Sequence, residues 1–274
     1  MKRCYRYVIY TTALVGLLSL MTDATAAHAS MSQSQQLALL EQANRAFEQA
    51  LDSTDEQRVQ GHYQQAIAAY EQLVATGLHN AKLYYNLGNA YFLQHDLGRA
   101  ILNYRRGLQL EPGNRRLQAN LRYVRSQRAD QIDPGMRQAL WTRLLFWSDD
   151  LSLQAQITLA LVAFLMIWAG VFAHLFWRRP VFLGLIGSAT FIFVLLTASV
   201  LLLHHQNTRT QNGVVVASEA PIRKGNGASY ALKFPQPLHS GTEFVVREHR
   251  GSWLHIQLAN GSNGWIRQAY AALW

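Results

Sequence analysis

Two long apolar segments constrain this chain more than any other feature of its sequence. Residues 155–177 and 181–204 contain no Asp, Glu, Lys or Arg, and only Arg178, Arg179 and Pro180 separate them. At ~1.5 Å per residue, each segment is long enough as a helix to cross the ~30 Å hydrocarbon core of a bilayer. The pattern therefore predicts a two-helix transmembrane hairpin. The alternative is a pair of buried helices in a soluble core, but the chain has no other apolar mass large enough to surround them.

The short loop between the two segments indicates their orientation. Arg178 and Arg179 lie in a loop of the length at which Lys/Arg bias is most informative, so this loop is expected to face the cytoplasm. The chain before and after the hairpin then lies on the opposite side of the membrane. Small residues four apart allow helices to approach closely, and the segments contain two such pairs: Ala169 with Ala173, and Gly184 with Ser188.

The first residues, 1–29, have the three parts of a secretory signal peptide: a basic start, an apolar centre and small residues at the end. We expect cleavage after Ala29, and an uncleaved anchor is the alternative. Both place the next segment outside the cytoplasm, in agreement with the hairpin loop. The sole cysteine, Cys4, lies within this segment, so the mature chain has no disulfide, thiolate metal site or cysteine nucleophile.

A repeat with a period of 34 residues follows the signal segment, because Ala66 and Tyr70 recur as Ala100 and Tyr104. Residues 81–114 carry seven side chains at the offsets of a tetratricopeptide repeat: Tyr84, Leu87, Gly88, Tyr91, Ala100, Tyr104 and Pro112. The small residues fit where two helices cross, the aromatic ones fill the space around the crossing, and the proline ends the second helix. The pattern predicts an all-α tetratricopeptide solenoid over residues 37–128.

The unit before this repeat is degenerate. If Phe47 takes the aromatic position of Tyr91, about ten residues more than the repeat needs precede the second helix. Residues 48–60 are then an insertion or an extended helix. Gly61 and His62 are expected in the turn before that second helix.

One further amphipathic helix, 115–127, is expected to cap the open end of the solenoid. Stacked helix pairs leave a concave groove lined by the first helix of each pair, and we expect six side chains there: Tyr85, Asn86, Asn89, Phe92, Arg116 and Asn120. Amides, aromatic rings and an arginine suit an extended peptide or a chain end, including one that ends in a carboxylate. The alternative is that Tyr85 and Asn89 are consensus residues that only help stacking.

Charge in the repeat region is polarised, with acidic residues in 41–56 and arginines in 99–128. Nucleic acid is not expected as a partner, because the region is exported and no series of stacking aromatic residues accompanies the arginines. Two interpretations remain: a solvated face, or a face for an acidic protein patch or anionic headgroups.

Between the repeats and the hairpin, residues 136–150 mix Leu and Trp with Arg, which favours a helix lying in the membrane interface. The alternative is an ordinary amphipathic helix packed on the repeats. After the hairpin, residues 213–274 change to short β-rich runs separated by turn residues, with Asn260-Gly261 between two of them.

This last region predicts an all-β SH3-like barrel, and its series Gly251-x-Trp253 and Gly264-Trp265-Ile266 resembles the bacterial SH3-type domain. Trp253 and Trp265 are the candidate surface residues. The alternative is that both tryptophans pack in the core or in turns. Elsewhere the chain lacks the HExxH, GxSxG and P-loop motifs and any Cys/His ligand set. We therefore expect no enzyme, no cofactor and no metal.

The order of parts predicts a multi-domain membrane protein: signal, tetratricopeptide repeats, hairpin, SH3-type domain. This order, with the run LYYNLGNAYF and then LGRAILNYRRGLQLEPGN, resembles the BatE-like proteins of aerotolerance operons. The resemblance implies a scaffold in a bacterial inner membrane with both soluble domains periplasmic, working with von Willebrand factor A-type membrane proteins and a MoxR-type ATPase. The competing hypothesis is a sensor that binds peptidoglycan through the SH3-type domain.

Overall fold

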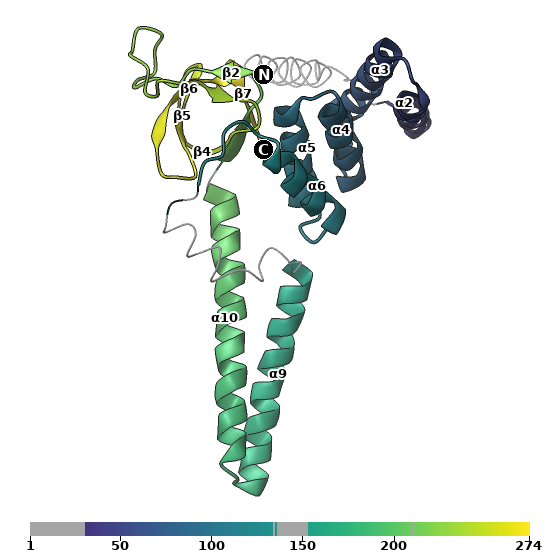
Figure 1. Cartoon of the computed structure of the whole chain (residues 1–274). Coiled ribbons are helices and arrows are strands. Elements are labelled where there is room, and N and C mark those ends of the chain that lie inside the picture. Colours follow the sequence, from purple (N-terminus) through teal and green to yellow (C-terminus); the bar gives the residue numbers. More distant parts are fainter. Residues whose placement is uncertain (1–30, 134, 136–152, 210) are drawn as a thin grey trace, which may run out of the picture.

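The computed structural model describes residues 31–133, 135, 153–209 and 211–274. A helical unit, a pair of long helices and a β unit follow one another along the chain (Figure 1). The predicted signal peptide at 1–29 and the predicted linker helix at 136–150 lie outside the described residues.

The helical unit begins each of its helices with a polar side chain that caps the first turn. The helices are α2 (Gln33–Asp52), α3 (Glu56–Ala75), α4 (Ala81–Leu93), α5 (Leu97–Leu110) and α6 (Arg115–Ser126). The capping side chains, which accept backbone N–H groups, are Ser32, Asp55, Asn80, Asp96 and Asn114. Such caps satisfy donors that a helix start leaves unpaired, so the sequence sets these boundaries locally.

The first helix pair is longer than the second. Helices α2 and α3 have 20 residues each, against 13 and 14 in α4 and α5. Residues 48–60 therefore extend two helices. The predicted turn at Gly61 and His62 is wrong, because the Asp55 carboxylate accepts the N–H of Gln57 at 3.1 Å and starts α3 earlier.

Two equivalent hydrogen bonds fix how the helix pairs correspond. The Tyr70 hydroxyl donates to Asn44 Oδ1 and the Tyr104 hydroxyl donates to Asn89 Oδ1, both at 2.7 Å. Asn44 is thus the counterpart of Asn89, and Phe47 takes the position of Phe92 rather than the expected position of Tyr91. The pair α4–α5 packs as its pattern predicts, since a Cβ on Gly88 would lie only 2.6 Å from the Tyr104 ring.

The β unit is an antiparallel sheet with strand order β6-β5-β4-β1-β7, beside the short pair β2-β3. The strands are β1 (Gln211–Val215), β2 (Glu219–Ala220), β3 (Leu238–His239), β4 (Glu243–Arg250), β5 (Trp253–Gln257), β6 (Asn263–Arg267) and β7 (Ala271–Leu273). Ile222, Leu254, Ile256 and Ile266 are buried in its core. Gly251 and Gly261 adopt the positive φ values of 56° and 86° that the β4–β5 and β5–β6 turns require. The turn predicted at Asn260-Gly261 is present.

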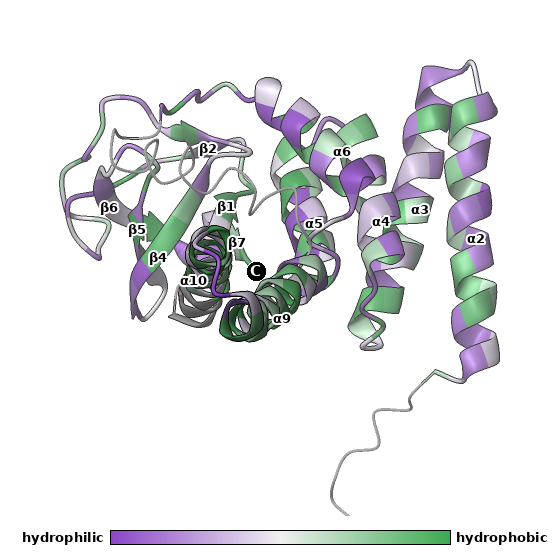
Figure 2. Ribbon diagram, turned by 90° about the horizontal axis from the view of Figure 1, so that it is seen from below, coloured by the Kyte–Doolittle hydropathy of each residue, from purple (hydrophilic) through white to green (hydrophobic). Residues whose placement is uncertain are grey.

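Helices α9 (Leu153–Trp177) and α10 (Val181–Arg209) lie side by side (Figure 1) and are apolar over most of their length (Figure 2). Their contact follows one stripe on each helix: Gln156, Ala163 and Gly170 on α9, with Ala189, Leu196 and Ser199 on α10. A Cβ on Gly170 would lie 2.8 Å from Ile186 Cγ1.

The small-residue contact expected from the sequence is wrong for this helix pair. Ala169, Gly184 and Ser188 are exposed, and nothing lies within 4 Å of a Cβ built on Gly184. Helices that are apolar all round carry no polar face to indicate which side meets the partner. The stripe residues recur instead at spacings of seven or three residues, which correspond to the heptad pattern of a left-handed coiled coil.

The β unit packs directly on the helical unit, although the two are far apart in the sequence. Val214 belongs to the same buried cluster as the helical core, and Val216, Ala272 and Trp274 pack against it. The Gly98 N–H donates to Ser240 Oγ at 3.0 Å. Both units therefore lie at one end of the α9–α10 pair (Figure 1).

Candidate functional site

The concave side of the helical unit has a cavity of about 160 Å³, lined by residues of α2, α4, α5 and α6. We call it the concave pocket; its lining residues are Phe47, Asn89, Phe92, Leu93, Tyr104, Asn120, Tyr123 and Val124. Three residues predicted for the groove lie here, namely Asn89, Phe92 and Asn120.

Asn89 organises the polar part of the concave pocket. Its Oδ1 accepts hydrogen bonds from the Tyr104 hydroxyl at 2.7 Å and from Asn120 Nδ2 at 2.8 Å. Burial raises the pKa of Tyr104, so the phenol stays neutral and donates. The Asn89 amide NH₂ has no hydrogen-bond partner among the described residues, which leaves it able to donate to a ligand.

Aromatic rings form the apolar part of the concave pocket. Phe92 and Tyr123 meet edge to face with their centroids 5.6 Å apart, and Tyr123 is 58% exposed. Phe47 closes the pocket from α2. Neither Phe47 nor Tyr123 is among the residues that the sequence predicts for the groove. Tyr123 follows Asn120 by three residues on the cap helix, a spacing that places both on one face.

The other three predicted groove residues lie outside the concave pocket. Asn86 Nδ2 donates to Asn44 Oδ1 at 3.4 Å, beside the Tyr70 hydroxyl. Burial raises the pKa of Tyr70 to about 12. Tyr85 packs against the helical core, and Arg116 is exposed in the first turn of α6. The concave side thus presents two successive Tyr–Asn pairs, of which only the second borders a cavity.

A larger crevice of about 410 Å³ lies between the convex side of the helical unit and the β unit. Its charged lining groups have partners within the chain: the Tyr91 hydroxyl donates to Glu71, Arg99 binds Asp96 at 2.6 Å, and Arg106 donates to the Leu273 carbonyl at 3.3 Å. Val216 and Ala272 form its β-unit wall. Because these groups bind one another or the β unit, we treat this crevice as part of the junction between the units.

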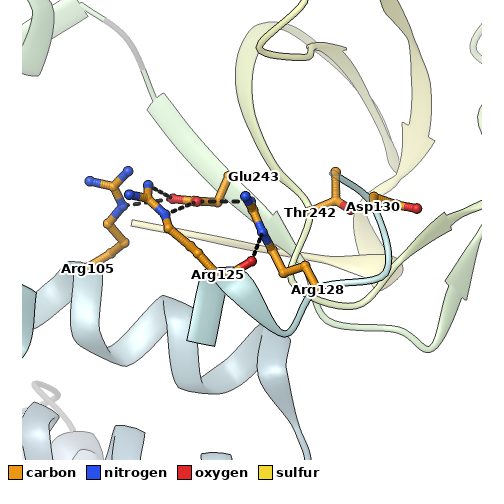
Figure 3. Close-up of polar contacts among 6 residues, drawn as sticks. All are labelled: Arg105, Arg125, Arg128, Asp130, Thr242 and Glu243. Carbon is orange, nitrogen blue, oxygen red and sulfur yellow. Dashed lines mark hydrogen bonds and ion pairs between the residues drawn. The ribbon is translucent and has the colours of Figure 1, made fainter. Parts of the chain in front are cut away.

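The junction is held by a buried carboxylate among three arginines (Figure 3). Glu243 lies 2.8 Å from Arg105, 2.7 Å from Arg125 and 3.3 Å from Arg128. Burial alone would raise the pKa of Glu243, but the charges and hydrogen bonds of Arg105 and Arg125 lower it to about 2. Part of the arginine-rich face expected to meet an acidic protein patch therefore meets a carboxylate of the same chain.

A second carboxylate reinforces the junction. Asp130 accepts the backbone N–H of His239 at 2.7 Å and the Thr242 hydroxyl at 2.6 Å, and it lies 2.8 Å from the His239 ring. Burial would raise the pKa of Asp130, but these hydrogen bonds lower it. The partners stand more than a hundred residues apart in the chain, so no local sequence pattern indicates them.

The two candidate tryptophans of the β unit are buried, with 8% of Trp253 and 9% of Trp265 exposed. Arg267 lies over the Trp253 ring at 5.5 Å and Arg250 over the Trp265 ring at 5.5 Å. The His255 ring also stacks on Trp265, with centroids 4.9 Å apart. This placement agrees with the packing interpretation, and the two rings form no open slot.

Comparison with known proteins identifies one segment. Residues 81–114, which span α4 and α5, match the tetratricopeptide repeat family. No curated protein matches the chain. This repeat is a non-catalytic module that binds protein partners. Within the described residues no group of three or more His, Cys, Asp or Glu side chains is placed to hold a metal ion.

Proposed function

We propose that this chain is a non-enzymatic scaffold of the bacterial envelope. It is anchored in the inner membrane by α9 and α10, and it captures a segment of a partner protein in the concave pocket. One observation carries the capture proposal. Beside the matched tetratricopeptide repeat, the Asn89 NH₂ group, which has no hydrogen-bond partner among the described residues, lies in a pocket lined by the aromatic side chains Phe47, Phe92 and Tyr123.

The anchor is supported by the surface of the helix pair. Both helices are long and apolar enough to cross a membrane. Large apolar side chains point outward along them, including Phe172 at 61%, Leu175 at 67% and Phe176 at 81% exposure. A continuous apolar surface of this kind favours hydrocarbon over water. Arg178 and Arg179 mark the cytoplasmic loop, so the two soluble units lie together on the periplasmic side.

The chemistry of the concave pocket fits an extended peptide. An amide NH₂ can donate to a backbone carbonyl or a terminal carboxylate. A cavity of ~150 Å³ holds a molecule the size of benzene, so this pocket can accept one apolar side chain. We therefore propose that the ligand of the concave pocket is an extended peptide with a single aromatic or large aliphatic anchor side chain.

For the partner we propose a von Willebrand factor A-type membrane protein of an aerotolerance-type complex, on the resemblance in the order of domains. The β unit, which we propose to be an SH3-like barrel spanning residues 213–274, would hold a second partner. The rival function is peptidoglycan sensing through this β unit. The burial of Trp253 and Trp265 favours the scaffold over the sensor, because wall recognition through them would need an open aromatic slot.

Co-purification of the tagged full-length chain from detergent-solubilised membranes tests the proposal. Tyr123→Ser should reduce the captured proteins by about tenfold, since exposed aromatic anchors dominate such interfaces. Tyr230→Ser, at a 51% exposed tyrosine on the β unit, is the matched control and should leave capture unchanged. We avoid Asn89→Ala, because it would leave the buried Tyr104 hydroxyl without its acceptor.

Two results would contradict the scaffold. Equal capture by the Tyr123→Ser variant would show that the concave pocket is not the partner site. If no protein co-purified, but the full-length chain sedimented with isolated cell wall, the peptidoglycan sensor would replace the scaffold.

A further inference from the structure

The tip of the β4–β5 hairpin projects toward the membrane end of the β unit. Strand β1 starts at Gln211, directly after α10, and Gln211 pairs with Val246 of the antiparallel strand β4. β4 continues past this pair to Arg250, in the direction of α10, for ~13 Å at ~3.3 Å per residue. His249 Nε2 lies 2.9 Å from Gln211 Oε1, and both views place the tip beside the end of α10 (Figures 1 and 2).

Three exposed arginines gather on one face of this hairpin and the adjoining strand β6. Arg250 pairs with Trp253, which pairs with Arg267, so the three side chains share a face. Arg247 joins them through hydrogen bonds to Gln257 on the same face of β5. One carboxylate accompanies them, Glu248, which binds Arg250 at 2.5 Å. Within β4, β5 and β6 the remaining carboxylate is Glu243, which the helical unit already binds.

The tryptophans beneath hold two of these guanidinium groups in place. Arg267 lies over Trp253 and Arg250 over Trp265, each 5.5 Å from the ring centroid. Stacking uses the flat face of a guanidinium and leaves the N–H groups on its edge able to donate. Such donors bind phosphate oxygens in pairs. This stacking explains why Trp253 and Trp265 lie next to Arg250 and Arg267 on the outer face of the sheet.

From this position and chemistry we propose that Arg247, Arg250 and Arg267 bind the phosphate groups of anionic lipids in the membrane that holds α9 and α10. This inference rests on the proposed membrane anchor. The apolar run of α10 continues through Leu203 in the sequence, and the helix ends at Arg209, a further rise of ~9 Å at ~1.5 Å per residue. The hairpin projects back by a comparable length, which brings its arginines to the headgroup layer.

The docked hairpin would fix the soluble units against the bilayer. Without it, α10 and the 136–152 segment alone would connect them to the membrane. With it, the concave pocket would keep one height and orientation relative to neighbouring membrane proteins. The scaffold would then select partners whose binding segment lies at that height.

Fluorescence quenching in lipid nanodiscs tests the docking. The full-length chain carries a fluorophore attached through Ser252→Cys in a Cys4→Ser background, and the discs contain lipids with a spin label on the headgroup. We expect strong quenching in discs with about one third phosphatidylglycerol and weak quenching in neutral phosphatidylcholine discs. Each arginine at an anionic surface contributes about fivefold. The variant Arg247→Gln/Arg250→Gln/Arg267→Gln should therefore lower the ratio of docked to undocked protein by roughly 100-fold.

The control variant Arg45→Gln/Arg58→Gln/Arg122→Gln removes the same charge from exposed positions of the helical unit and should keep the quenching. Equal quenching in neutral and anionic discs, or full quenching in the hairpin variant, would overturn the docking. A chain that enters the discs but shows no quenching in anionic ones overturns the docking alone. A chain that does not enter the discs overturns the anchor as well.

Discussion

Glu243 of the β unit joins the two units through three arginines of the helical unit. Its side chain is 15% exposed and meets three guanidinium groups. Glu243→Gln would leave these three guanidinium groups, whose side chains are 20–34% exposed, without their shared counter-charge, which costs about 3 kcal/mol. We expect that loss in the free energy of unfolding, measured by denaturant titration of the full-length chain in detergent.

An exposed ion pair provides the comparison for Glu243. Glu248 binds Arg250 with a side chain that is 42% exposed, and such pairs contribute less than about 1 kcal/mol. Glu248→Gln should therefore change the unfolding free energy little. If the two substitutions had equal effects, the buried cluster would not be what joins the units.

The same residue predicts how stability depends on pH. The pKa of Glu243 falls from 4.5 in the unfolded chain to about 2 in the folded one. A depressed pKa stabilises the fold above the unfolded value, and this stabilisation is lost as the pH falls from about 4.5 toward 2. Asp130, whose pKa is also lowered, acts in the same direction.

Denaturant titrations between about pH 5 and pH 2 check this dependence. We expect the unfolding free energy to fall by roughly 3 kcal/mol through Glu243, at 1.36 kcal/mol per pKa unit. Glu243→Gln should remove that part of the slope. A wild-type and a variant profile that run parallel would contradict the assignment.

At the scale of elements, Gly170 sets the distance between α9 and α10. A side chain there would meet Ile186, whereas a side chain at Gly184 would point into open space. Gly170→Val should separate the helices and lower the thermal midpoint of the full-length chain in detergent, while Gly184→Val should not. The reverse order would indicate that the two helices meet through the face that carries Gly184.

The elements differ in how far the sequence predicts them. The helix pair α4–α5 follows from its motif because each matched residue has one local packing role, as Gly88 has against Tyr104. The turn at Gly261 follows from its backbone requirement. The sequence places the start of α3 too late. Gly61 resembles a turn glycine, although it lies inside the helix. The predicted contact face of α9 is also wrong. A helix that is apolar on all sides has no polar face to indicate which side meets its partner.

The residues of the candidate site also differ in how far the sequence predicts them. Asn89, Phe92 and Asn120 could be predicted because helix periodicity places them on the concave side. Phe47 could not, since the longer first helix pair hides its correspondence to Phe92. The contacts of Glu243 depend on the folding of two distant segments onto one another, which periodicity does not describe.

At the scale of the whole molecule, the two faces of the helical unit differ in what they contact. Its concave side, formed by α2, α4 and α6, carries the concave pocket. Its convex side, with α3 and α5, meets the β unit through the crevice and the arginine cluster. A peptide held on the concave side would leave the β unit unobstructed. The arrangement suits a scaffold that holds two partners at once.

The packing of the helical unit against the β unit also predicts the membrane topology. Because the helical unit and the β unit pack together at one end of α9 and α10, a reporter fused after Trp274 must share a compartment with one placed before α2. We expect both to be active only with a reporter that works outside the cytoplasm. A reporter inserted between Arg178 and Pro180 should require the cytoplasm. Activity of a cytoplasm-only reporter after Trp274 would reverse the orientation, and opposite compartments for the two ends would exclude the hairpin.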